Sequence, residues 1–431
     1  MFSVFVNAWK VKDIRNKLLY VLAVLAIYRL GCHIPLPGMD LQSLSLARGG
    51  AMGGAPTLFS LIAGGGFGTI FALGIAPYIT ASIIMQLMTA AIPKLEQLQK
   101  EGEDGRKKIN QITRILAIVL GVLQGGGTVY SMHGLFKYQN WLVYIMATVA
   151  IVAGVSLIMW VAELLTEKGI GNGASFIIFA NILSGLGGAI YTFTIFLTNA
   201  TFWTYAMFLG LAIAFVLIMA FVVLVQDGER RIPVQYSKKM VGRQMFGGQS
   251  SYIPIKVNIA GVMSIIFAIS FLQVPEVLSQ FWSPPWIRTL ANFLDINSPF
   301  VFNIAGNFIA IPTGAIIYVF LIFCFTFFYT SFAVNPVEMA ENMKKNGGAI
   351  PGVRTGKPTS EYIQTVIKRM SWIGAVFYSA IAVTPILMQW LFGIPVGFGG
   401  TTLLIVTGVA LELVKQIESQ LLMRHYKGFL S

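Results

Sequence analysis

The residue types that most often perform chemistry are few and scattered in this chain. The three histidines, His33, His133 and His425, have no Cys or carboxylate partners at metal-ligand spacing, so we expect no metal site. Cys32 and Cys324 both lie in apolar runs, which argues against a disulfide framework. The sequence contains no catalytic constellation of another kind, and we therefore predict no cofactor and no enzymatic activity.

Two glycine clusters superficially resemble phosphate-binding loops. Residues 64–68 and 169–173 are rich in glycine, but neither cluster follows a strand in a βαβ unit, and no Lys-Ser/Thr pair of a P-loop comes after them. Both absences argue against nucleotide binding. The second cluster is better suited to begin a helix, with glycine giving the tight turn and Asn172 acting as the cap.

Isoleucines at helical spacing are more informative. The first group recurs at i, i+4 and i+8 on a helix that Pro77 should bend, and consists of Ile75, Ile79 and Ile83. Further isoleucines on other predicted helices are Ile178 and Ile182, Ile265 and Ile266, and Ile405. A ring of such side chains could form a constriction that passes a substrate and excludes ions by dewetting. Helix packing or lipid contact gives the same pattern, and spacing alone favours that interpretation.

Amides within apolar runs are the second kind of candidate. Gln86, Asn181 and Asn258 could form interhelical hydrogen bonds, worth about 0.6–2 kcal/mol each, that latch helices which must sometimes part. A static packing role is equally consistent with their positions. Ion-coupled transporters depend on ionisable residues near the middle of a span, and the sequence has none there. This argues against a secondary transporter of a small molecule.

Membrane-spanning helices must position these residues. The 431-residue chain is 56% hydrophobic and 11% charged, whereas a soluble domain has about 25% charged residues. Its apolar runs are too long and continuous for the strands of an outer-membrane barrel, so we predict an all-α polytopic membrane protein. The ten predicted transmembrane helices lie at residues 18–35, 69–92, 112–132, 141–162, 173–196, 204–226, 257–274, 306–331, 370–391 and 399–414.

The basic residues predict the topology. The 30 Lys and Arg gather on one side of the predicted spans, and the exceptions are Arg29, Arg48, Lys137 and Arg288. The positive-inside rule then places both termini in the cytoplasm. Ten spans divide into five plus five, residues 1–200 and 201–431. An odd number of spans in each half makes the halves inverted repeats, which place a transport route at their interface.

Two cytoplasmic loops are longer than this topology requires. Residues 227–256 and 335–369 are rich in basic and turn-forming residues and contain apolar anchors. We interpret them as ordered projections that dock an acidic partner, either RNA or a protein face. Binding to anionic lipid headgroups is the alternative.

An uncharged stretch at residues 57–93 is too long for one span and a little short for two. Its glycine cluster separates a short apolar segment, residues 58–63, from the span that begins near residue 69. Six helical residues rise only about 9 Å and cannot cross a bilayer. The stretch therefore predicts a re-entrant helix that either plugs a cavity or packs statically, and spacing alone favours static packing.

Six segments share long motifs with one known family. They are TLFSLIAGGGFGTIFALGIAPYITASIIMQL, KEGEDGRKKINQITR, TEKGIGNGASFIIFANI, DGERRIPVQYSKKMVGRQMFGGQSSYIPIKVNIAGV, NPVEMAENMKKNGGAIPGVRTGKPT and GGTTLLIVTGVALELVKQ. Over nearly its whole length the chain resembles the SecY family, the central subunits of Sec protein translocases. The resemblance implies ten transmembrane helices in two pseudo-symmetric inverted halves around a central pore, with a hydrophobic pore ring, a short re-entrant plug helix and a lateral gate.

Carried onto this sequence, the resemblance assigns roles to particular residues. The pore ring would consist of Ile75, Ile79, Ile178, Ile182, Ile266 and Ile405, with Ile265 as the alternative to Ile266. The plug would consist of Leu58, Phe59, Ser60, Leu61, Ile62, Ala63, Gly64, Gly65, Gly66 and Phe67. Gln86 and Asn258 would lie at the lateral gate, and Arg243 and Arg354 would dock partners.

The resemblance also implies a function and a set of partners. The chain would pass unfolded secretory polypeptides across the bacterial plasma membrane and release transmembrane segments sideways into the lipid bilayer. Partners would supply the energy. They would be the SecE and SecG membrane subunits, the SecA motor ATPase, and the ribosome through rRNA contacts of the basic loops, with an unfolded preprotein or signal peptide as the substrate.

Overall fold

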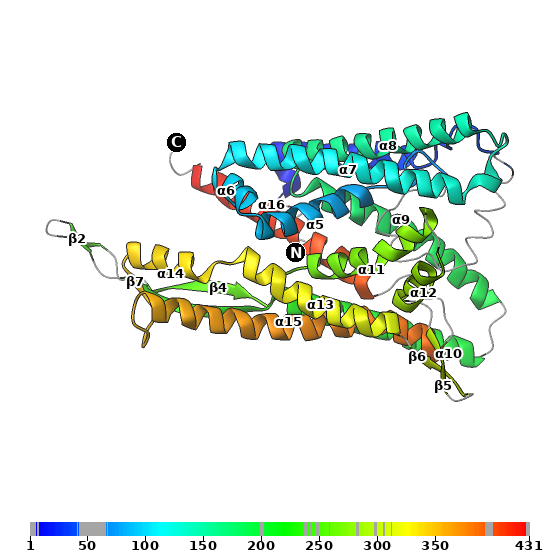
Figure 1. Ribbon diagram of the computed structural model, residues 1–431. Helices are drawn as coiled ribbons and strands as arrows, with labels where there is room; N and C mark the ends of the chain where they lie inside the picture. The colour runs from blue at the N-terminus through cyan, green and yellow to red at the C-terminus, as the bar shows by residue number, and fades with distance from the viewer. Residues whose placement is uncertain are drawn as a thin grey trace. The chain divides into compact units, whose positions relative to one another are not determined.

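Long helices make up most of the structure, a computed structural model (Figure 1). It describes residues 6, 8–40, 42, 66, 68–198, 202–236, 239–241, 244–246, 250–257, 259–281, 284–296, 300–304, 307–311, 313–392 and 400–427. Each predicted span overlaps one long helix. These helices are α2 (Lys12–Gly31), α5 (Ala76–Ala91), α7 (Glu103–Ser131), α8 (Trp141–Lys168), α9 (Gly173–Thr198), α10 (Phe202–Asp227), α11 (Met263–Phe281), α13 (Thr313–Ala333), α15 (Lys357–Phe392) and α16 (Gly400–Lys427).

Several described helices are long and apolar enough to cross a membrane. Four candidates satisfy both conditions alone, and they are Glu103–Ser131, Trp141–Lys168, Thr313–Lys345 and Lys357–Thr384. A fifth candidate joins α5 to α6 (Pro93–Lys100) across a bend of 101°. Shorter apolar helices that coincide with predicted spans are Gly173–Gly185, Val216–Asp227 and Met263–Pro275. The described helices are thus consistent with ten spans, and the predicted helical polytopic fold is confirmed.

The beginning of α5 differs from the prediction. Thr69 pairs with Pro35 in an isolated β-bridge and residues 70–75 form turns, so the helix begins only at Ala76. Pro77 lies in the first turn of α5, where its missing N–H would have no helical acceptor in any case. The expectation that Pro77 bends this helix is therefore wrong. The bend of 101° lies at the other end of α5, where Pro93 begins α6.

The chain divides into two compact units. Unit one consists of Met1–Leu209, Leu272–Leu294 and Leu387–Ser431, and unit two consists of Gly210–Phe271 and Asp295–Ile386. Unit one therefore contains α2, α5 to α9 and α16, whereas unit two contains α13 and most of α15. The inverted symmetry of two five-helix halves stays a prediction.

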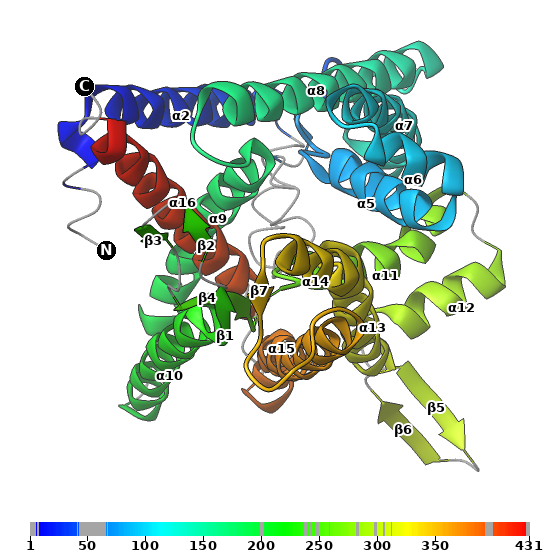
Figure 2. The same ribbon diagram turned by 90° about the vertical axis from the view of Figure 1, so that its left-hand side faces the viewer.

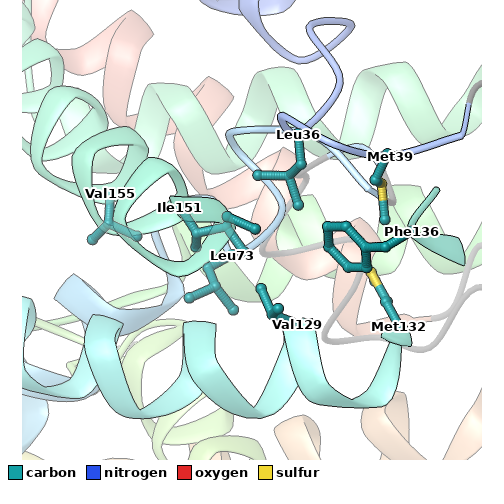
Figure 3. Packing of buried hydrophobic residues seen from close by; sticks show 9 residues of the cluster. Leu36, Met39, Leu73, Val129, Met132, Phe136, Ile151 and Val155 are labelled. Atoms are coloured by element: carbon teal, nitrogen blue, oxygen red, sulfur yellow. The ribbon is translucent and has the colours of Figure 1, made fainter. Parts of the chain in front are cut away.

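Close helix packing builds one core of unit one (Figure 3). Its buried residues are Leu36, Met39, Leu73, Val129, Met132, Phe136, Ala147, Ile151 and Val155. On α7, a Cβ at Gly125 would lie 3.3 Å from Ile151, and one at Gly121 would lie 3.7 Å from Val155. Two small residues four positions apart allow membrane helices to approach closely. The glycines thereby bring α7 against α8.

The two basic loops fold together in unit two (Figure 2). β1 (Glu229–Tyr236) pairs antiparallel with β4 (Ser250–Lys256), and β7 (Gly348–Ala349) pairs with the other edge of β1. An apolar cluster joins these strands to α14 (Pro336–Lys345) and α15, and its buried members are Ile232, Val234, Ile255, Met343, Ile350, Ile363 and Ile367. The loops are therefore ordered over their described residues, as predicted.

The remaining elements are short. They are the hairpins β2 (Lys239–Val241) with β3 (Gln244–Phe246) and β5 (Phe300–Ile304) with β6 (Asn307–Ile311), the helix α12 (Pro285–Leu294) and the 3-10 turn η1 (His133–Leu135).

Candidate functional site

The six isoleucines assigned to the ring are all buried, with at most 9% of any residue exposed. The members in unit one are Ile75 and Ile79 at the start of α5, Ile178 and Ile182 on α9, and Ile405 on α16. Ile266 lies on α11 in unit two, and its neighbour Ile265 is buried too, so burial does not choose between the two. Burial is what a constriction requires of these side chains, and helix packing requires it as well.

Helix α9, which carries two of the isoleucines, has a well-defined start. Asn172 caps it as predicted, because its Oδ1 accepts a hydrogen bond from the backbone N–H of Ala174 over 3.0 Å. Gly171 precedes the cap with φ +92°, and a Cβ there would collide with Gln416 of α16. Glycine at this position therefore permits the backbone turn, and α9 packs on α16 (Figure 2).

Asn181 of α9 makes the interhelical hydrogen bonds that its amide suggested. The Tyr28 hydroxyl donates to Asn181 Oδ1 over 3.0 Å, and both residues are buried. Arg29 Nη1 donates to the same oxygen over 3.4 Å. The Tyr28 ring also stacks on Phe71, with 5.7 Å between the ring centroids. Sequence reasoning missed Tyr28 and Phe71, because a tyrosine or phenylalanine in an apolar run carries no signal of its partner.

The base of the predicted plug is anchored to the chain that follows α2. Of the plug, residues 58–67, the structure describes only Gly66, and the other plug residues lie outside the described ones. The Gly66 carbonyl accepts from Thr69 twice, from the backbone N–H over 3.1 Å and from Oγ1 over 2.7 Å. The Gly68 carbonyl accepts from the N–H of Leu36 over 3.0 Å. Gly68 has φ +71°, which favours glycine at this turn.

The residues assigned to the lateral gate are only partly described. Gln86 is half-buried on α5 and donates from Nε2 to Ser82 Oγ of the same helix over 3.4 Å. Asn258 lies outside the described residues. The gate assignment of both amides stays a prediction.

Arg354, assigned to docking, is exposed in the turn between β7 and α15. Its carbonyl accepts a hydrogen bond from Thr359 Oγ1 over 2.8 Å, and Thr359 is buried. The backbone of the turn is therefore held while the guanidinium remains available. Arg243, its predicted companion, lies outside the described residues.

A second cationic feature lies on the solvent face of the sheet. The Arg231 guanidinium lies 4.9 Å from the centre of the Tyr252 ring and 2.7 Å from Glu229 Oε1. The hydrogen bond to that carboxylate raises the pKa of Arg231. These side chains are exposed, so the ion pair adds little stability and mainly orients the guanidinium on the aromatic ring.

No metal site occurs within the described part of the chain, since no group of three His, Cys, Asp or Glu gathers there.

The ion pair between α7 and α8 is formed by Arg114 and Glu163, with two N–O distances of 2.6 Å. Such a bidentate pair adds geometric specificity to the contact between the two helices. It supplies no proton relay at mid-span, because both residues lie near the ends of the predicted spans.

Comparison with known proteins identifies relatives over the whole chain. A family model described as SecY matches residues 69–414. The protein translocase subunit SecY of Streptomyces scabiei is 42% identical over 455 residues, which cover 100% of both proteins. That of Thermus thermophilus is 42% identical over 451 residues, covering 100% of this chain and 98% of the relative.

Solved structures share the fold. One, described as "The structure of a protein conducting channel", has a TM-score of 0.65 at 18% identity and covers 93% of this chain and 91% of that one. Another, Sec61 in the canine ribosome-channel complex from the endoplasmic reticulum, has a TM-score of 0.61 at 16% identity and covers the same shares. At these identities the likeness concerns the fold, which is that of a protein-conducting channel.

Proposed function

The chain belongs to the SecY family of protein translocase subunits, and from that premise we propose how its residues conduct a polypeptide. It is a multi-pass membrane protein that forms part of a protein translocation channel. A secondary transporter of a small molecule, the alternative from the sequence, is not favoured. We infer that partners supply the driving force, since the sequence predicts neither a nucleotide site nor a buried proton relay.

The proposed constriction is a ring of branched apolar side chains, namely Ile75, Ile79, Ile178, Ile182, Ile266 and Ile405. The observation that carries this proposal is the burial of all six. Such side chains recognise no particular chemistry, so they can close around a polypeptide of any sequence. They also exclude ions by dewetting when no polypeptide is present. Ile266 joins the ring through its match to the family motif, with Ile265 as the alternative.

The plug and the lateral gate complete the proposed channel. Residues 58–67 would close the pore from the external side, and the backbone hydrogen bonds at Gly66 and Gly68 support a fixed base for their movement. Gln86 and Asn258 would line the gate through which transmembrane segments leave for the bilayer. The two inverted halves, residues 1–200 and 201–431, would move apart to open both routes.

Partners would supply energy and substrate. We assign SecE and SecG as membrane subunits and the plasma membrane as the location, with both termini in the cytoplasm. The SecA motor and the ribosome would bind the basic loops through Arg243 and Arg354. A solved relative described as a ribosome-channel complex supports ribosome docking. The shared sheet and apolar cluster of the two loops support a single docking body.

Reconstitution tests the proposed function. The translocase complex that contains this chain is placed in sealed vesicles with the motor ATPase, ATP and a labelled unfolded preprotein. We expect the preprotein to become protected from external protease only when chain, motor and ATP are all present. Vesicles that accumulate a small solute and never protect the preprotein would contradict the proposal.

A further inference from the structure

Tyr28 of α2 touches two segments that carry constriction isoleucines. Its hydroxyl donates to Asn181 Oδ1 over 3.0 Å, and Asn181 directly precedes Ile182 on α9. Its ring stacks on Phe71 with a centroid distance of 5.7 Å, and Phe71 lies in the turn that leads to Ile75. The buried side chain of Tyr28 thus connects the first span to two segments, one that leads to Ile75 and one that carries Ile182.

We propose that Tyr28 and Asn181 are positioning residues that form a latch, which holds α9 against α2 and keeps the constriction closed in the idle channel. This inference rests on the isoleucine constriction proposed above. Both side chains are buried, so water does not readily take the place of the bond between them. Moving α9 away from α2 therefore separates the buried Asn181 oxygen from both of its donors on α2. Both helices lie within residues 1–200, so the latch keeps Ile178 and Ile182 in position within one half of the channel.

The acceptor oxygen of Asn181 is the essential atom of the latch. It accepts from the Tyr28 hydroxyl and from Arg29 Nη1, which are two donors on the same helix. Asp in place of Asn181 keeps an oxygen at this position and puts its charge beside the Arg29 guanidinium. Leu has a similar size and offers no acceptor. These two substitutions therefore separate the hydrogen bond from mere packing.

The stacking of Tyr28 on Phe71, which supports the latch, depends on the absence of a side chain at Gly31. A Cβ there would collide with the Phe71 ring, so glycine allows that ring to lie against α2 and reach Tyr28. Cys32 follows Gly31, and its carbonyl would lie 2.6 Å from a Cβ at Gly66, the described residue of the plug. The latch and the base of the plug therefore share the end of α2.

Ion conductance of the idle channel tests the latch. The complete translocase complex is reconstituted in planar bilayers without motor or preprotein, with wild-type chain or with Tyr28→Phe, Asn181→Leu or Asn181→Asp. We expect Tyr28→Phe and Asn181→Leu to raise the idle conductance about three- to thirtyfold, the range equivalent to one interhelical hydrogen bond in a membrane. Asn181→Asp should stay near wild type. Tyr138→Phe, which removes the hydroxyl of an exposed tyrosine, is the matched control.

Preprotein translocation by the same preparations separates this inference from the proposed function. If Tyr28→Phe and Asn181→Leu conduct like wild type while all preparations translocate preprotein, the latch is wrong and the channel function stands. If Asn181→Asp leaks as much as Asn181→Leu, the acceptor oxygen is not what holds α9, and the latch is again overturned. If the wild-type complex translocates no preprotein, the proposed function fails.

Discussion

Gln235 of the first basic loop and Ala349 of the second are cross-strand partners in one antiparallel sheet. The two loops are separated in sequence by α11, α12 and α13, yet β1 pairs with β4 on one edge and with β7 on the other. The apolar cluster then joins both loops to α14 and α15. A partner that binds either loop therefore acts on one folded body.

Ile232→Ala should loosen both loops together. Ile232 is 1% exposed within the apolar cluster, and removing such a side chain typically costs about 2–4 kcal/mol. Limited proteolysis of the complex should cut residues 227–256 and 335–369 faster. Val337→Ala, an exposed position on α14, is the control and should leave both rates unchanged. Faster cleavage confined to the first loop would show that the loops are independent.

Arg354→Glu should weaken motor-driven translocation and leave the fold intact. The side chain is exposed, and the turn is held through its backbone by Thr359, so charge reversal removes only the cation offered to an acidic partner. We expect a severalfold lower translocation rate at unchanged thermal stability. Lys357→Glu reverses another exposed charge of the same loop and should have a smaller effect. Equal translocation by Arg354→Glu and wild type would remove Arg354 from the docking site.

Gly154→Ala and Gly121→Ala should differ in stability although the two glycines lie on the neighbouring helices α8 and α7. A Cβ at Gly154 would collide with the carbonyl oxygen of Ile70, which cannot yield without moving backbone. A Cβ at Gly121 would meet Val155 at 3.7 Å, an ordinary contact. Thermal unfolding of the purified complex should show that Gly154→Ala lowers the free energy of unfolding by about 1–3 kcal/mol and that Gly121→Ala does not. Equal melting temperatures would contradict the close approach of α8 to residue 70.

Polar substitutions in the constriction should admit ions. Ile79→Asn and Ile405→Asn place a hydrogen-bonding group where dewetting is proposed to exclude ions, so idle conductance in planar bilayers should rise. Ile115→Asn, at an exposed position of α7, is the matched control and should leave conductance unchanged. Unaltered conductance in both constriction variants would show that these side chains do not seal the pore.

Features that depend only on residues close in the sequence, such as helices and helix caps, were predictable. Long apolar runs predicted the helices, because burial in a membrane demands about 20 apolar residues wherever the helix packs. Asn172 before a glycine-rich start predicted a cap, and its Oδ1 hydrogen bond confirms it. The prediction that Pro77 bends a helix was wrong because the residues before it form turns. Pro77 therefore lies in the first turn of α5, where proline is tolerated.

Contacts between distant segments were not predictable. Tyr28 and Asn181 are 153 positions apart. Helical periodicity predicts which face of a helix is apolar, but it does not predict which other helix packs against that face. The pairing of β1 with β7 is hidden for the same reason, since β7 spans only two residues. Roles of the plug, the gate and Arg243 came from the family resemblance, and they stay predictions.

The central claim is that a translocating polypeptide passes through the isoleucine constriction. Cysteines are placed singly at Ile79, Ile182 and Ile405 in the translocase complex, and a secretory chain carrying one cysteine is stalled midway during transport. We predict disulfide crosslinks from all three positions to the stalled chain, and none from the exposed position Ile115. Efficient stalling without crosslinks at positions 79, 182 and 405 would contradict the account.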